Sequence, residues 1–345
     1  MHSRISYARF LLAAALALLS AVAQASVGLT ELAGKDGDGP VTIFYPSNSE
    51  SQPVVRGPFT VQAALQGVPM GGNGRLIVIS HGSGGTPWVH ADVARALVEG
   101  GFVVAVPEHR GDNHKDNGSP GPESWKLRPA EVSRAIDAVG RDSRFAPSLK
   151  LDRVGMYGMS AGGHTALTLA GGRWSPARFR QHCEEHIADD FNACVGLATR
   201  LTGGMLDGLK KTIALSVIRL RFGDAKWYTH ADPRVAAVVA GVPYAADFDM
   251  ASLASPRVPL ALVTARQDKW LVRRFHSDLV LKACATCERL ADLPEGGHGA
   301  LLSPLPPGLT GLIGELLNDP PGFDRAALPQ VERKIVAFFR KQLLP

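Results

Sequence analysis

A serine between two glycines gives the clearest chemical signal in this sequence. In the stretch YGMSAGGH, Ser160 lies two residues from both Gly158 and Gly162, after an apolar run and before a helix-forming tail. A serine hydroxyl becomes a strong nucleophile only when a base removes its proton, and a sharp strand-to-helix turn exposes it to a carbonyl group. Such a turn strains the serine backbone and needs small residues two positions away on each side. The pattern predicts a nucleophile, with a simple glycine-rich turn as the alternative.

An acid and a histidine follow this serine in the chain order that such a nucleophile needs. Asp268 ends the apolar run VPLALVTARQD, and His298 lies in EGGHGALL after the run ERLADLP. We expect His298 to take the proton of Ser160, and Asp268 to fix the tautomer of the histidine. The alternative acids are Asp247 and Asp249 in GVPYAADFDM, which follow the preceding predicted strand.

A glycine-rich loop, SHGSGGT, follows the buried apolar run RLIVI. Attack on a carbonyl group develops an oxyanion, which backbone N–H groups after the nucleophile and after an earlier strand can stabilise. We assign these two donors to Ala161 and Ser83. The loop lacks the lysine of a phosphate-binding loop and the third glycine of a dinucleotide fingerprint, so we expect no organic cofactor.

The run HCEEH, residues 182–186, matches the HxxEH pattern of one class of zinc peptidase. Its alternative role is that of a polar helical segment attached through Cys183. A zinc site would need a distant carboxylate ligand, which the sequence does not place. We therefore predict no metal site and keep the zinc peptidase as an alternative.

Predicted strands and helices alternate along the chain, which indicates an α/β domain with a mostly parallel sheet flanked by helices. The carboxyl ends of parallel strands share one edge of the sheet, so the serine, the acid and the histidine are expected to meet there. The predicted strands span residues 41–46, 75–82, 102–111, 152–158, 234–243, 258–268 and 288–294, and the predicted helices span 90–101, 128–140, 160–172 and 329–344.

Residues 173–232 interrupt this alternation and are predicted to form a helical cap insertion. The stretch GMLDGLKKTIALSVIRLRF within them places its apolar residues mostly on one helical face, among Lys210, Lys211, Arg219 and Arg221. Two roles stay open for the insertion. It packs on the surface of the core, or it covers the site and shapes a pocket for the acyl or alcohol group.

The first 25 residues have the features of a secretory signal peptide. Arg4 and Arg9 precede a short apolar run, and small residues lead to a cleavage position after Ala25. The run is too short for a comfortable membrane span, although an uncleaved anchor is the alternative. We expect a secreted or periplasmic domain of residues 26–345, without an integral membrane span after cleavage.

Four cysteines fit an oxidising compartment, and we expect them to form disulfides. Three pairings are open to Cys183, Cys194, Cys284 and Cys287, of which the pairing of neighbours closes two short loops. A zinc finger is disfavoured because CATC has no second pair at the required spacing. The formal net charge of +5 is weak and dispersed, so no nucleic-acid partner is expected.

Taken together, these segments resemble the α/β-hydrolases grouped as predicted dienelactone hydrolases, which are related to the platelet-activating-factor acetylhydrolases of type II. The resemblance runs over nearly all of residues 26–345 and rests on VTIFYPS, ISHGSGG, VPEHRGDN, LRPAEVSRAID, RVGMYGMSAGGHTAL, DPRVAAVVAGVP, LALVTARQD, GGHGALL and DPPGFDR. It implies an α/β-hydrolase fold and a triad of Ser160, Asp268 and His298.

The chain departs from this group in two ways. Dienelactone hydrolases use a cysteine nucleophile where this chain has Ser160, so lactone hydrolysis is not implied. The acetylhydrolases have the acid one strand earlier, which keeps Asp247 and Asp249 as alternatives. The sequence thus predicts a serine hydrolase that cleaves a small or lipid-like carboxylic ester through an acyl-enzyme. An amidase or peptidase with the same triad, and a binding protein that has lost catalysis, are the alternatives.

Overall fold

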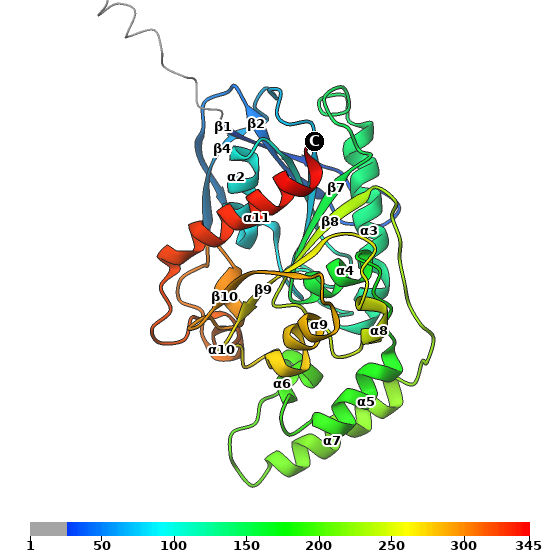
Figure 1. Ribbon diagram of the computed structural model, residues 1–345. Coiled ribbons are helices and arrows are strands. Elements are labelled where there is room, and N and C mark those ends of the chain that lie inside the picture. The colour runs from blue at the N-terminus through cyan, green and yellow to red at the C-terminus, as the bar shows by residue number, and fades with distance from the viewer. Residues whose placement is uncertain (1–25) are drawn as a thin grey trace, which may run out of the picture.

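The computed structural model describes residues 26–345, which form an α/β structure around one sheet (Figure 1). Six neighbouring strands are parallel: β5 (Leu76–Ser80), β6 (Val103–Pro107), β7 (Val154–Met159), β8 (Val235–Gly241), β9 (Leu260–Ala265) and β10 (Glu288–Leu293). The sheet continues with β1 (Ser26–Leu32), β2 (Val41–Ser47), β3 (Gln52–Arg56) and β4 (Phe59–Leu65). The ten strands lie in the order β10-β9-β8-β7-β5-β6-β2-β1-β4-β3, and β2 runs antiparallel to both of its neighbours.

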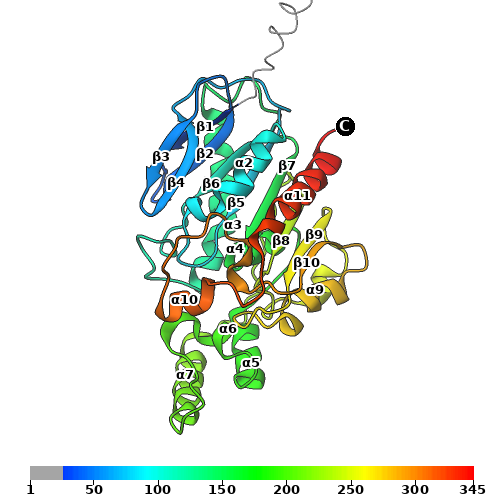
Figure 2. The same cartoon turned by 90° about the vertical axis from the view of Figure 1, so that its left-hand side faces the viewer.

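Helices cover both faces of the sheet, because the side chains of a strand point alternately to opposite faces. In β5, Ile77 and Ile79 belong to the core on one face, while Leu76 and Val78 belong to the core on the other. The first face packs against α2 (Ala91–Glu99) and α11 (Leu328–Leu343), which are in front in Figure 2. The second face packs against α3 (Pro122–Arg141), α4 (Ala161–Leu169), α8 (Met250–Leu253) and α9 (Ser277–Ala283).

The predicted α/β class and mostly parallel sheet are confirmed, and each predicted strand and helix corresponds to an observed one. Two differences stand out. The strands β1, β3 and β4 have no counterpart among the predicted elements, and α3 begins at Pro122 instead of residue 128. Residues 1–25, to which the predicted signal peptide belongs, lie outside the described residues. Over residues 26–345, no helix has both the length and the hydropathy to cross a membrane.

The predicted insertion contains α5 (Pro176–His186), α6 (Phe191–Val195) and α7 (Asp207–Arg221). A disulfide between Cys183 and Cys194 joins α5 to α6. The side chain of Asn192 in α6 donates a hydrogen bond to the carbonyl of Lys269, which fixes the insertion to the loop after β9. The helix α7 packs on α5 and extends away from the sheet in both views (Figures 1 and 2).

Both disulfides join neighbouring cysteines, so the structure selects one of the three pairings. The second bond links Cys284 to Cys287 just after α9. Among the described residues no cysteine is left free.

Candidate active site

Ser160 lies at a strained turn between β7 and α4. Its φ of 58° and ψ of −118° are unusual for a residue with a side chain. A Cβ atom on Gly158 would lie 2.0 Å from the carbonyl oxygen of Gly162, and a Cβ atom on Gly162 would lie 1.9 Å from that of Ser80. Only glycine fits at either position, so the two glycines permit the turn that leaves Ser160 half-buried at the end of the sheet.

The structure brings the serine, the histidine and the preferred acid together in a hydrogen-bonded chain. The Nε2 atom of His298 lies 2.9 Å from Oγ of Ser160, and its Nδ1 atom lies 2.8 Å from Oδ2 of Asp268. Oδ1 of Asp268 accepts hydrogen bonds from the N–H groups of Trp270 and Leu271, both at 2.8 Å. With a carboxylate at Nδ1, the proton of a neutral imidazole resides there, and Nε2 is left to accept the serine proton.

Contacts from the C-terminal part of the chain fix the loop that carries His298. A Cβ atom on Gly299 would lie 2.1 Å from the carbonyl oxygen of Leu317, so this loop lies directly against the end of α10 (Gly311–Leu317). Arg325 donates to the carbonyls of Gly299 and Leu302, and it forms an ion pair with Asp319. These contacts give a structural role to the segment DPPGFDR.

Two backbone N–H groups suit an oxyanion near Ser160. Ala161 is the first residue of α4, where backbone N–H groups have no partner within the helix. Ser83 lies in the loop after β5, and a Cβ atom on the preceding Gly82 would lie 3.4 Å from Cβ of Ser160. Among residues 26–345, neither N–H donates a hydrogen bond to another group. Both predicted donors are therefore unpaired and close to the serine.

A buried ion pair fixes the loop after β5, which carries Ser83. Arg128 of α3 lies 2.7 Å from Asp112, and both side chains are fully shielded from solvent. Arg128 also donates to the carbonyls of His81 and Gly82, while Asp112 accepts from the hydroxyl of Ser83. Burial alone would raise the pKa of Asp112, but Arg128 and the hydrogen bonds outweigh burial and lower it. The pair thus connects α3 to the backbone of the loop that carries Ser83.

A second chain of serine, histidine and carboxylate lies beneath the same loop. His109 contacts Ser80 through Nε2 at 2.7 Å and Glu131 through Nδ1 at 2.5 Å. Burial, with a smaller effect of Arg128, lowers the pKa of His109 well below its usual value, which keeps the ring neutral. Ser80 is completely buried, so this chain shapes the loop and offers no nucleophile to a substrate.

The sequence does not reveal this supporting network in advance. A signal was nevertheless present in LRPAEVSRAID, where Arg128 and Glu131 share a helical face with the apolar residues Val132 and Ala135. Charged side chains on a buried face require partners.

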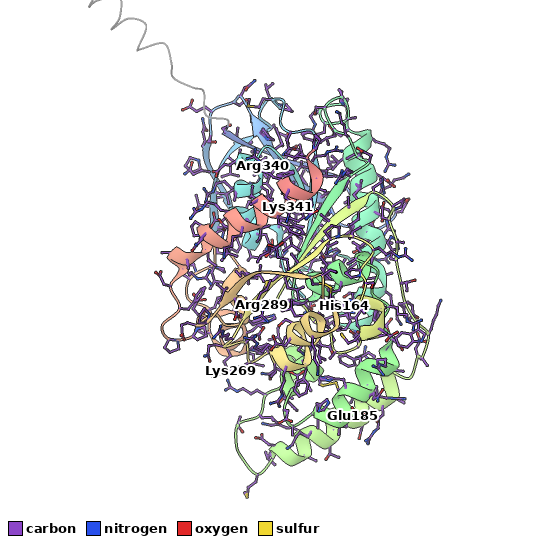
Figure 3. All side chains as sticks on the ribbon, in the orientation of Figure 1. His164, Glu185, Lys269, Arg289, Arg340 and Lys341 are labelled. Atoms are coloured by element: carbon purple, nitrogen blue, oxygen red, sulfur yellow. A yellow bond between two sulfur atoms is a disulfide. The ribbon has the colours of Figure 1, made fainter. Side chains whose placement is uncertain are left out.

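The alternative acids lie elsewhere. Asp247 is buried and pairs at 3.2 Å with His164 of α4. Figure 3 labels this histidine. The ring of His164 stacks on Trp125 at 4.5 Å between centroids. Asp249 accepts from the N–H of Ala251 at the start of α8 and pairs with Arg173. Within residues 26–345, neither of these acids contacts His298, the histidine that is hydrogen-bonded to Ser160.

The HxxEH segment does not assemble as a zinc peptidase site would require. Glu185 lies on α5 (Figure 3), where its carboxylate accepts a hydrogen bond from Gln181. His182 instead contacts Asp190, which also contacts His276, at 2.8 and 2.9 Å. These three buried side chains lie close enough together to hold a metal ion, and they are the one group of this kind among the described residues.

The hydrogen bonds of His276 show which of its ring nitrogens carries the proton. Nδ1 of His276 accepts the backbone N–H of Ala245, so the proton of its neutral ring must be on Nε2, the atom that faces Asp190. A histidine that binds a metal through Nε2 carries its proton on Nδ1 and donates it to an acceptor. We therefore interpret the cluster as a hydrogen-bonded junction between the insertion and the segment after β9.

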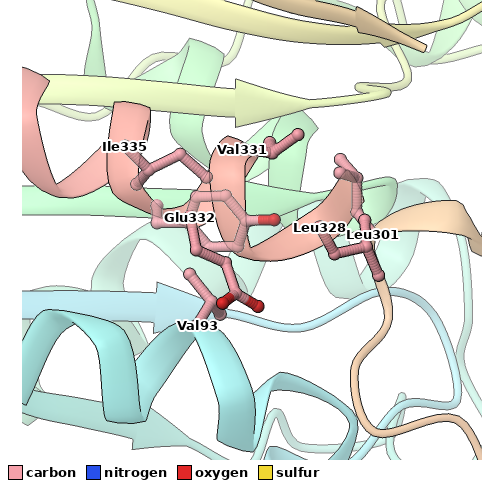
Figure 4. A pocket seen from close by; sticks show the side chains of 7 residues that line it. Val93, Leu301, Leu328, Val331, Glu332 and Ile335 are labelled. Carbon is pink, nitrogen blue, oxygen red and sulfur yellow. The ribbon is translucent and has the colours of Figure 1, made fainter. Parts of the chain in front are cut away.

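Two of the cavities within residues 26–345 lie away from Ser160, His298 and Asp268. One of about 270 Å³ adjoins the residues after the oxyanion loop and is lined by Glu31, Thr42, Arg56, Gly57, Pro58, Phe59, Thr86, Pro87, Trp88, Glu108, His114 and Lys115. The other, of about 10 Å³, lies between α11 and α2 (Figure 4). There Glu332 projects toward Val93, and burial, with a smaller effect of Asp92, raises the pKa of Glu332 to about 7.

No family model and no curated protein matches this chain.

Proposed function

We propose that this protein is a serine-dependent carboxylic ester hydrolase of the α/β-hydrolase fold, related to the predicted dienelactone hydrolases. The observation that carries the proposal is the hydrogen-bonded chain from Ser160 through His298 to Asp268 at the carboxyl ends of three parallel strands. The strained φ of Ser160 and the two unpaired N–H groups beside it support the same conclusion. Together these features suit acyl transfer.

In the first half-reaction, Oγ of Ser160 attacks the carbonyl carbon of the ester while Nε2 of His298 takes the hydroxyl proton. The N–H groups of Ser83 and Ala161 stabilise the oxyanion, and one such donor is worth about 100-fold to 1000-fold in kcat. Asp268 stabilises the imidazolium. The C–O bond to the alcohol then breaks, and the histidine protonates the departing alkoxide.

In the second half-reaction, a water molecule replaces the alcohol. Nε2 of His298 takes a proton from this water, whose oxygen attacks the acyl carbon. The bond from the acyl carbon to Oγ of Ser160 breaks, and the proton returns to the serine. The products are a carboxylic acid and an alcohol, and the enzyme is restored without any cofactor in this scheme.

We infer a secreted or periplasmic location and a small or lipid-like ester as substrate. The two disulfides are consistent with an oxidising compartment, as is the signal-like composition of residues 1–25.

The decisive experiment combines a fluorophosphonate with mass spectrometry of the labelled peptide. We expect stoichiometric labelling of Ser160 and none of Ser80, which has the same kinds of partners but is buried. Ser160→Ala should remove both labelling and hydrolysis of short nitrophenyl esters. A folded Ser160→Ala variant with wild-type turnover would refute the proposal, and turnover of aminoacyl anilides but no esters would favour an amidase.

A further inference from the structure

The helix α7 carries an apolar stripe that the rest of the fold leaves uncovered. Its residues recur at spacings of three and four, which places them on one face of the helix. Each is at least about half exposed, although apolar side chains of this size normally contribute to a core. The stripe consists of Leu206 (67% exposed), Leu209 (57%), Ile213 (55%), Val217 (47%) and Leu220 (87%).

A different face of the same helix holds it to the protein. Ile218 is buried, and Phe222, just after the helix, packs edge-on against Phe179 of α5 with centroids 4.9 Å apart. The helix therefore has its own packing surface, and the exposed stripe is an additional one. Helices normally have one apolar face for one core.

Basic side chains occupy the rest of the surface of α7, and two of them, Lys210 and Arg221, lie directly beside the stripe. Lys210, Lys211, Arg219 and Arg221 lie on α7, whose one acidic residue is Asp207. Two of these cations have acidic partners, because Lys210 contacts Asp207 and Arg219 contacts Glu184. A helix with an exposed apolar stripe and a basic surround is typical of segments that lie in the interface of an anionic membrane.

We propose that α7 docks on an anionic phospholipid surface, with its apolar stripe inserted at the boundary between headgroups and acyl chains. The charge distribution favours lipid over a second copy of this chain. Two copies paired through the stripe would bring together two helices that each carry four cations and one acidic residue, with Glu184 of α5 as the one further acidic partner. Anionic headgroups would instead complement this charge.

The position of α7 connects this surface with the candidate active site. The insertion contacts the segment after Asp268, since Asp190 accepts the N–H of Val272. Arg200, just before α7, pairs with Glu315 of α10, which lies against the loop of His298. Docking would therefore hold the triad end of the sheet beside the lipid, a consequence that rests on the proposed function.

Co-sedimentation with vesicles tests the docking. We expect binding to phosphatidylcholine vesicles that contain about one third phosphatidylglycerol, and at least about tenfold weaker binding to phosphatidylcholine alone. Leu209→Ser, Ile213→Ser and Leu220→Ser combined should reduce the binding at least about tenfold, because three inserted side chains are lost. The matched control combines Val55→Ser, Leu65→Ser and Val68→Ser. These substitutions change three exposed apolar residues in β3, at the end of β4 and just after it, and should leave binding unchanged.

Three outcomes would overturn the proposal: equal binding to both kinds of vesicle, unchanged binding of the α7 variant, or a lipid-free dimer that the α7 substitutions dissociate. The vesicle assay can be run in the Ser160→Ala background, so it does not depend on catalysis. Conversely, fluorophosphonate labelling of Ser160 in the α7 variant tests the proposed function without lipid. Each proposal can therefore fail without the other.

Discussion

Arg128 and Asp112 form an ion pair of 2.7 Å in which neither side chain is exposed to solvent. The two residues belong to different segments, and through them α3 contacts the carbonyls of His81 and Gly82 and the hydroxyl of Ser83. The loop that faces Ser160 is thus fixed by charged groups in the interior. Its geometry and the stability of the fold depend on the same pair.

Removal of one partner of this pair should strongly destabilise the protein. We expect Arg128→Met to lower the free energy of unfolding by about 3–5 kcal/mol, because Asp112 would remain as an uncompensated buried charge. Chemical denaturation measures the change. The control is Arg95→Met, which removes an exposed ion pair with Asp92 and Glu99 and should cost less than about 1 kcal/mol. Similar losses in both variants would show that the buried pair has no special role.

The identity of the catalytic acid can be tested by two isosteric substitutions. Asp268→Asn should lower kcat by about 10⁴, because the amide no longer favours the tautomer of His298 that accepts the serine proton. Asp247→Asn should lower kcat by less than about tenfold, since Asp247 contacts His164 instead. Esterase assays on variants with native circular dichroism measure both effects. A reversed order of the two losses would identify the acid one strand earlier.

Glu332 should make the stability of the fold depend on pH. Its pKa is raised from 4.5 to about 7, so the folded state favours the protonated carboxyl, and ionisation opposes folding. The contribution to stability is therefore complete below about pH 4.5 and is lost as the pH rises through about 7.

The corresponding variant is Glu332→Gln, which cannot ionise. We expect it to stabilise the protein at pH 8 by about 1–2 kcal/mol relative to wild type, and to change stability little at pH 4. Thermal unfolding across this pH range measures the difference. A constant difference between the two proteins from pH 4 to pH 8 would contradict the assignment.

The two disulfides should differ in their contributions to stability. Loss of the bond from Cys183 to Cys194, through paired substitution by alanine, should cost about 3 kcal/mol, because it closes the longer loop. Loss of the bond from Cys284 to Cys287 should cost less than about 2 kcal/mol. Denaturant titration of each double variant gives the values, and equal losses would show that loop length does not govern the effect.

The alternation of apolar runs and helical patterns was sufficient to predict the parallel part of the sheet. Fully buried parallel strands such as β5 and β7 are continuous apolar stretches, which stand out in a sequence. The strands β3 and β4 are different, because QPVVR and FTVQAAL mix exposed with buried residues near one edge of the sheet. Short, partly exposed strands of this kind lack the continuous apolar stretch of a fully buried strand, so they stand out less in a sequence.

The contact between Ser160, His298 and Asp268 was predictable because their chain order and their positions after strands follow from general geometry. Their supporting contacts were not. Asp112 and Arg128 are 16 residues apart, and Glu131 contacts His109 across 22 residues. Periodicity indicates which face of a helix is buried but not which charges meet there, since partner choice depends on the packing of separate elements.

The glycine contacts around Ser160 have a consequence for how this protein tolerates change over evolutionary time. Gly162 lies so close to the carbonyl of Ser80 that the turn of Ser160 and the end of β5 touch through backbone atoms alone. Side chains elsewhere in the core can diverge and repack, but this contact leaves no room for a side chain at residue 162. The spacing between the turn of Ser160 and the end of β5 is therefore insulated from neutral substitution in the surrounding core as long as residue 162 remains glycine.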